Sequence, residues 1–72
     1  MKNYIRVERS KLDITQDQLA EAIQVSRQTI HSIERGKFIP STLTALKIAR
    51  YFKVKVEDIF ILESVDSLIN KL

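Results

Sequence analysis

Apolar residues recur at helical spacing in several separate stretches of this chain of 72 residues. In the clearest stretch, Leu19, Ala20 and Ile23 fall on one face of a helix. Thr15 precedes them as a candidate cap for the free N–H groups of the first turn, and Gln18 stands three residues later to bond back. The pattern therefore predicts a helix that begins directly after the threonine and buries this face.

Another helix is predicted directly after this one, and its two faces differ more strongly. Ser26 stands as its cap, Ile30 and Ile33 point to one side, and Gly36 ends the helix in a left-handed conformation. The opposite face carries hydrogen-bonding side chains and no carboxylate: Arg27, Gln28, His31, Ser32 and Arg35. We therefore expect the chain to present this helix to a partner.

The remaining elements are predicted from the same kind of pattern. The first helix of the chain is expected over residues 1–11, so the two helices described above are the second and the third. A fourth is expected from its cap Ser41 to about Phe52, and a short fifth over about 56–61. The apolar face of the fourth helix is broad: Leu43, Ala45, Leu46, Ile48, Ala49 and Phe52. Three aromatic residues are expected to pack in the core or at its edge: Phe38, Tyr51 and Phe60. With one Gly and one Pro, the chain favours helices joined by short turns, so the expected fold class is all-α.

The end of the chain continues the apolar spacing as a separate segment, so we expect a domain over residues 1–62 and a tail over residues 63–72. Four apolar residues of the tail recur at three- and four-residue steps: Val65, Leu68, Ile69 and Leu72. This spacing predicts an amphipathic helix or a continuation of the fifth helix. The tail either folds back over its own core or forms the seam of a homodimer, and an edge strand near Ile61 is a third alternative.

Composition excludes several classes of protein. The chain is 44% hydrophobic and 29% charged, which is typical of a globular domain, and it contains no cysteine and therefore no disulfide. It has no apolar run of membrane-spanning length and no signal-peptide core, so we expect a cytoplasmic protein without membrane contact. With one histidine, scattered carboxylates and no nucleophile beside a base, we expect neither an enzyme nor a metal or cofactor site.

The polar face of the third helix, the one capped by Ser26, matches the chemistry of DNA bases. Arginine bonds guanine through two parallel hydrogen bonds, glutamine does the same to adenine, and both geometries fit the major groove. The net charge of +3 and the pI near 9.5 favour a polyanion, although many small domains are as basic. The expected partner is double-stranded DNA, and no small-molecule ligand is expected.

The stretch TQDQLAEAIQVSRQTIHSIERGK, from Thr15 to Lys37, resembles the helix-turn-helix core of the Xre family, the repressor and Cro group of bacteria and phages. PSTLTALKIAR and VEDIF are similar to the fourth and fifth helices of that family. The resemblance covers about residues 2–62. It implies a five-helix, lambda-repressor-like DNA-binding domain and a sequence-specific transcriptional regulator, expected here to be a repressor.

The expected DNA contacts fall into two groups. Side chains expected to meet base edges are Arg27, Gln28, Thr29, His31 and Ser32. Side chains expected to meet phosphates are Gln16, Ser26, Arg35, Lys37 and Ser41. The resemblance implies that Gln16 clamps a phosphate and can brace Gln28. Phosphate contacts set the register on the duplex, whereas base contacts set the sequence that is read.

One ion pair is expected inside the domain. Glu34 lies next to Ile33, on the inward side of the second helix of the motif, where an unpaired carboxylate is costly. We expect Arg9 of the first helix to be its partner, and the resemblance implies the same structural tie. The alternative is that both charges are solvated separately.

A short regulator needs two recognition helices to read a two-fold operator, so we expect a homodimer. A different class remains open, because the resemblance also includes antitoxins and adaptors that bind a protein partner. Four residues depart from the family pattern: Glu8, Gln24, Lys53 and Lys55. Gln24 stands where the family usually has Gly, and a left-handed conformation there costs about 1 kcal/mol. Lys55 offers no acceptor to cap the fifth helix.

Overall fold

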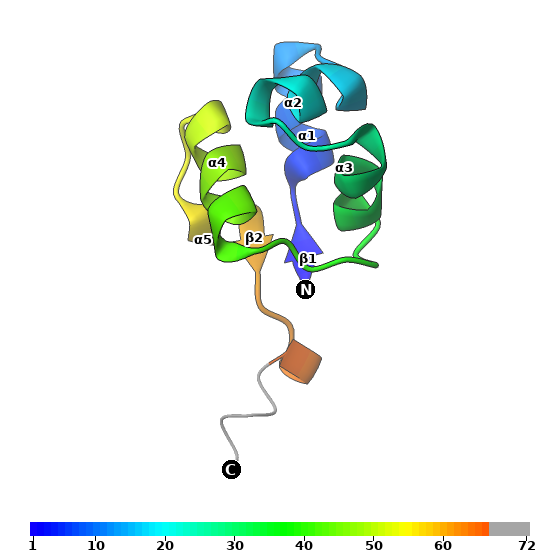
Figure 1. Cartoon of the computed structure of the whole chain (residues 1–72). Coiled ribbons are helices and arrows are strands. Elements are labelled where there is room, and N and C mark those ends of the chain that lie inside the picture. Colours follow the sequence, from blue (N-terminus) through cyan, green and yellow to red (C-terminus); the bar gives the residue numbers. More distant parts are fainter. Residues whose placement is uncertain (67–72) are drawn as a thin grey trace.

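Within residues 1–66, which the computed structural model describes, five short helices surround one core (Figure 1). The helices are α1 (Ile5–Leu12), α2 (Gln16–Ile23), α3 (Arg27–Glu34), α4 (Thr42–Phe52) and α5 (Val56–Ile59), and the strands are β1 (Lys2–Asn3) and β2 (Phe60–Ile61). The expected five-helix, lambda-repressor-like fold is confirmed. The pair of strands is an addition that the all-α prediction did not contain.

The first and fifth helices are shorter than predicted because residues at their outer ends form the sheet. The two strands pair antiparallel, with Lys2 opposite Ile61 and Asn3 opposite Phe60. The helix expected over residues 1–11 therefore begins at Ile5, and the predicted continuation of α5 into the tail is wrong. The edge strand that was one alternative for residues near Ile61 is present as β2.

The end of the described chain lies beside its start. The α-ammonium group of Met1 donates a hydrogen bond to Asp66 at 3.3 Å and lies 3.3 Å from a carboxylate oxygen of Glu63. The hydrogen bond to Asp66 raises the pKa of this α-ammonium group, although desolvation opposes the shift. Residues 63–66 are thus tied to the start of β1. The domain boundary after residue 62 stays a prediction.

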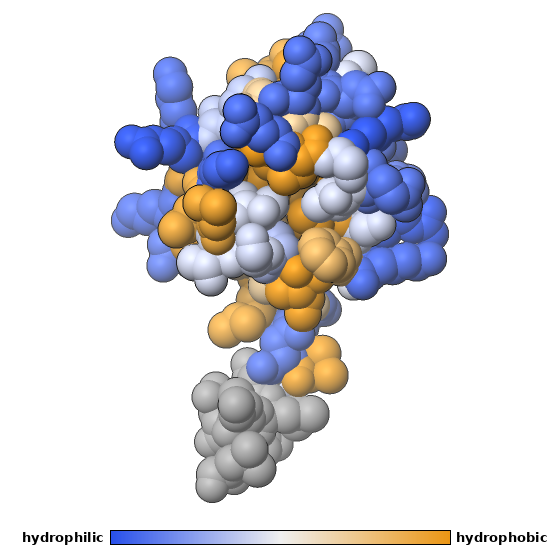
Figure 2. All heavy atoms as spheres, in the orientation of Figure 1, coloured by the Kyte–Doolittle hydropathy of each residue, from blue (hydrophilic) through white to orange (hydrophobic). Residues whose placement is uncertain are grey.

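Some side chains that were expected to pack lie on the surface instead. Leu43 and Leu46 of α4 are 64% and 52% exposed, and Phe38, which precedes α4, is 52% exposed. Tyr51 is also exposed, at 36%, with its ring edge-on to that of the buried Phe52, whereas Phe60 is buried as expected. Hydrophilic side chains cover the side of the molecule on which α3 lies, and hydrophobic surface shows between α3 and α4 and beside α4 (Figure 2). The apolar face of α4 is therefore only half covered.

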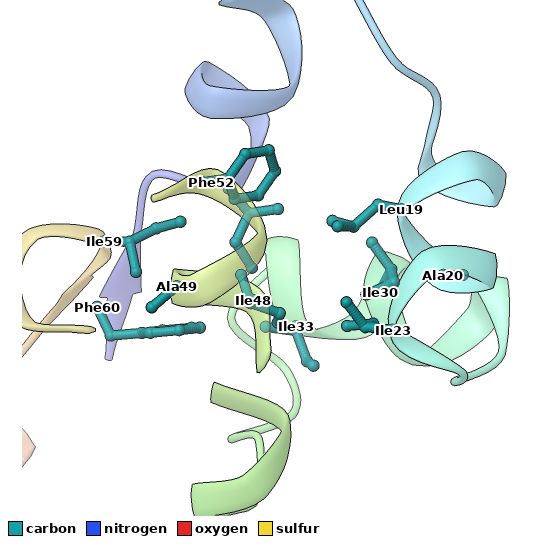
Figure 3. Close-up of a cluster of buried hydrophobic side chains, with 11 residues drawn as sticks. Leu19, Ala20, Ile23, Ile30, Ile33, Ile48, Ala49, Phe52, Ile59 and Phe60 are labelled. Carbon is teal, nitrogen blue, oxygen red and sulfur yellow. The ribbon is translucent and has the colours of Figure 1, made fainter. Parts of the chain in front are cut away.

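The core is built mainly from isoleucine side chains of the four longer helices and from α5 and β2 (Figure 3). Its buried members are Ile5, Leu19, Ala20, Ile23, Ile30, Ile33, Ile48, Ala49, Phe52, Ile59 and Phe60. Burying one isoleucine side chain contributes about 1.5–3 kcal/mol. Because Ile30 and Ile33 are 0% and 1% exposed, α3 is fixed by its inner face and its outer face is left to solvent.

The helix starts follow local rules. The predicted capping box of α2 is present: the N–H of Gln18 donates to Thr15 Oγ1 at 3.0 Å, and the N–H of Thr15 donates to Gln18 Oε1 at 2.8 Å. Ser26 and Ser41 cap α3 and α4 in the predicted way. Lys55 makes no side-chain cap for α5, as expected.

Within residues 1–66, three non-glycine residues end helices in the left-handed conformation: Asp13, Gln24 and Lys53, with φ of 54°, 62° and 59°. The strain expected at Gln24 is therefore present, at a cost of about 1 kcal/mol. Gly36, after α3, adopts φ of 73° without this cost. The turns that frame α3 thus combine one strained residue and one unstrained residue.

Candidate nucleic-acid interface

The predicted row of polar side chains lies on the outer side of α3. Arg27, Gln28 and Arg35 are exposed, and Thr29, His31 and Ser32 are half-buried. The N–H groups at the start of the helix are capped by Ser26, whose hydroxyl also lies 2.8 Å from that of Thr29. The row is thus presented by a helix that is capped at its start and packed along its back.

The first side chain of the row, Arg27, is held only loosely. Its Nε lies 3.8 Å from a carboxylate oxygen of Asp17, and the two side chains are 68% and 72% exposed. An exposed pair at this distance contributes little stability, because solvent screens it and both side chains stay mobile. The guanidinium group of Arg27 therefore remains available to a ligand.

The contacts of Gln16 differ from those that the resemblance implied. Its Nε2 lies 3.4 Å from His31 Nδ1 and donates to Glu34 Oε1 at 3.3 Å. Gln28, which Gln16 was expected to brace, instead donates to the hydroxyl of Ser32 at 3.5 Å. The expected Gln16–Gln28 contact is thus replaced by contacts to two residues in the second half of α3. The reason is that the half-buried side chain of Gln16, at the start of α2, lies beside the half-buried side chains of His31 and Glu34, whereas Gln28 is exposed.

The expected ion pair between Arg9 and Glu34 is present. Arg9 donates to both carboxylate oxygens of Glu34, from Nε at 2.7 Å and from Nη2 at 3.0 Å. Its Nη1 also donates to the carbonyl oxygen of Ile14 at 3.0 Å. The side chains of Arg9 and Glu34 are only 15% and 7% exposed, and the hydrogen bond to Glu34 raises the pKa of Arg9. This pair ties α1 and the turn before α2 to α3.

A second tie to α3 was missed at the sequence level. The amide nitrogen of Asn3, in β1, donates to the carbonyl oxygen of Ile33 at 2.8 Å, and its side-chain oxygen accepts from the N–H of Ile5 at 3.2 Å. The sequence signal was an asparagine two residues before an apolar helical pattern, where it can satisfy a free N–H group. The strand that holds Asn3 in place was the part that the local pattern did not reveal.

The connection from α3 to α4 lies at the other end of the row. Lys37 is exposed directly after Gly36, and the hydroxyl of Ser41 accepts from the N–H of Thr44 at 3.2 Å. Together, the exposed row and its flanks offer arginine, lysine, amide and hydroxyl donors. These are the groups that proteins use on phosphates and on base edges.

Within residues 1–66, no group of three His, Cys, Asp or Glu side chains converges as a metal site would require. None of the helices in the described part of the chain is long and apolar enough to cross a membrane.

Comparison with known proteins gives a consistent result. A family model described as helix-turn-helix matches residues 5–59, from α1 to α5. Over 63 residues the chain is 52% identical to an uncharacterized HTH-type transcriptional regulator of Methanocaldococcus jannaschii, covering 88% of this chain and 96% of that protein. It is 44% identical over 63 residues to one of Bacillus subtilis, with coverage of 88% and 96%. It is 46% identical over 63 residues to one of Archaeoglobus fulgidus, with coverage of 88% and 89%.

Proposed function

Because this chain belongs to the helix-turn-helix family of the Xre, or Cro and C1, type and is a DNA-binding transcriptional regulator rather than an enzyme, we propose that it is a repressor that reads a two-fold symmetric operator as a homodimer. The observation that carries this proposal is the outer face of α3. That face is polar and cationic, and its opposite side is anchored by two fully buried isoleucines.

In the proposed complex, α3 lies in the major groove. Arg27 and Gln28 stand in its first turn and are exposed, so they are the main groups for base edges. Thr29, His31 and Ser32 are half-buried. We assign them supporting contacts to bases or to the adjoining backbone.

Phosphate contacts are proposed for groups at the two ends of the row: Gln16, Ser26, Arg35, Lys37 and Ser41. The amide nitrogen of Gln16 faces His31 and Glu34, so Gln16 is proposed to act through its backbone N–H at the start of α2. Ser26 and Ser41 cap helices through their hydroxyl oxygens. Occupying the operator is enough for repression, because polymerase cannot use DNA that a dimer covers. We place this activity in the cytoplasm, where chromosomal DNA is read.

The homodimer needs an apolar surface away from α3. The tail was predicted to supply it, and of those residues Val65 is 69% exposed, while Leu68, Ile69 and Leu72 lie outside the described residues. A second apolar surface is present on α4 and the connection before it, which we call the α4 face: Ile39, Leu43 and Leu46, exposed by 64%, 64% and 52%. Leu46 lines two of the shallow apolar grooves beside α4. We propose that the α4 face forms part of the seam.

The proposal is tested by selecting binding sites from a random duplex pool with the purified chain and measuring affinity at several salt concentrations. We expect a two-fold symmetric enriched site and a log–log salt slope of about −0.9 per phosphate contact. Weak, salt-sensitive binding without an enriched site would contradict a specific regulator. In that case the exposed apolar surfaces would favour the alternative of an antitoxin or adaptor that captures a protein.

Replacing Leu46 by glutamate is expected to convert the homodimer into a monomer, because a charge in an apolar seam loses its hydration. Sedimentation equilibrium measures the change as a fall from two protomer masses to one. Leu12→Glu is the matched control, since Leu12 on α1 is also 52% exposed and lies outside the α4 face. Two variants with the same dimer dissociation constant would show that the α4 face is not the seam.

A further inference from the structure

A polar concavity of about 400 Å3 opens between α1, the start of α2 and α3. Its walls are formed by Arg6, Arg9, Gln16, Arg27, His31, Glu34 and Arg35. Four of these residues are arginines and one is a carboxylate, so the concavity carries excess positive charge. Arg6, which points to this concavity from α1, belongs to none of the DNA contacts considered so far.

The charges in the concavity are not equally available. Arg9 and Glu34 neutralise each other through two hydrogen bonds and are largely buried. Arg6 and Arg35 are exposed, and in the part of the chain that the structure describes neither has an ion-pair partner within 4.0 Å. The concavity therefore has a neutral base and a cationic rim, which suits an anion that enters from the solvent side.

The direction of the Gln16 amide restricts which groups can hold this anion. Its nitrogen donates a hydrogen bond to the carboxylate of Glu34 at 3.3 Å and lies 3.4 Å from His31 Nδ1. The side-chain donors of Gln16 are thus turned into the protein. Among the side chains that line the concavity, the guanidinium groups on the rim are therefore the ones that can bind an anion.

The ligand that fits is a phosphodiester. Guanidinium groups form paired, charge-assisted hydrogen bonds with phosphate oxygens. The concavity also shares Arg27 and His31 with the polar row of α3, so an anion bound there lies next to the bases that the row would read. We propose that the concavity seats one phosphate of the DNA backbone and that Arg6 is a phosphate-binding residue alongside Arg35. This inference rests on the proposed DNA-reading function and adds a backbone contact from α1.

The test compares Arg6→Ala with the unaltered chain on the selected site and on an unrelated duplex. Arg6→Ala is expected to weaken binding to both by the same factor, at least about tenfold. The magnitude of the salt slope should fall by about 0.9 for each bound protomer. Arg50→Ala is the matched control, because Arg50 is an exposed arginine that lines a different groove beside α4 and its loss changes the net charge equally. The enriched site should be the same for all three proteins.

A neutral methylphosphonate placed at each backbone position of the selected site locates the contact. The unaltered chain should lose affinity at one position per half-site where Arg6→Ala, which keeps Arg35, loses clearly less. If Arg6→Ala matches Arg50→Ala in affinity and slope, and no such position exists, the inference is wrong while the proposed function stands. If the unaltered chain binds no duplex, the proposed function fails first. Circular dichroism melting verifies that both variants are folded.

Discussion

Replacing Arg27 and Gln28 together by alanine is expected to weaken binding to the selected operator by about a hundredfold or more. Each bidentate contact to a base discriminates by roughly 1–3 kcal/mol, and both recognition helices of a homodimer lose their contacts at once. The fold should persist, because both side chains are exposed and neither caps a helix. Fluorescence anisotropy of labelled duplexes measures the loss, and the melting temperature reports on the fold.

The control for this prediction removes the same two residue types elsewhere. Gln24→Ala with Arg50→Ala takes away an exposed glutamine and an exposed arginine outside the row. This double variant should keep its affinity and its enriched site. If instead both double variants bind the operator equally well, the outer face of α3 is not the reading surface. Capture of a protein partner by both would then support the antitoxin or adaptor alternative.

Replacing Arg9 by alanine is expected to lower the free energy of unfolding by about 3 kcal/mol or more, because it leaves the nearly buried carboxylate of Glu34 without its partner. For a domain of this size, that loss corresponds to a fall in Tm of at least about 12 °C. It also removes a large share of the roughly 5–15 kcal/mol by which such domains are stable. Urea unfolding followed by circular dichroism measures the change.

Two companion variants separate the buried pair from a general charge effect. Lys11→Ala breaks the pair with Glu8, in which the Lys11 side chain is 65% exposed, and should cost no more than about 1 kcal/mol. Arg9→Met combined with Glu34→Leu should recover most of the lost stability, since no unpaired charge remains. A loss from Arg9→Ala as small as that from Lys11→Ala would mean that Glu34 gains its hydration in the variant and that the pair is not a structural tie.

The parts of the candidate site that lie within one helix could be predicted from the sequence. The alternation of Ile30 and Ile33 with the polar row follows from 3.6 residues per turn, and the start of α3 follows from Ser26. The partner of Glu34 was also predictable, because a carboxylate on a buried face needs a cation and the resemblance pointed to Arg9. Residues that meet only when helices pack were not predictable in this way. Gln16 contacts His31 rather than Gln28, and Arg6 joins the concavity.

The sequence by itself determined that the helices form, how α2, α3 and α4 are capped and which side of each helix is apolar, because these depend on residues within about four positions of one another. Only the tertiary structure decided the pairing of β1 with β2, the exposure of Leu43 and Leu46, and the convergence of α1 with α3 around one concavity. A strand of two residues has no periodic pattern, and its hydrogen bonds come from the opposite end of the chain. An apolar residue on a helix face is buried only where another element covers it, and that depends on how the helices cross.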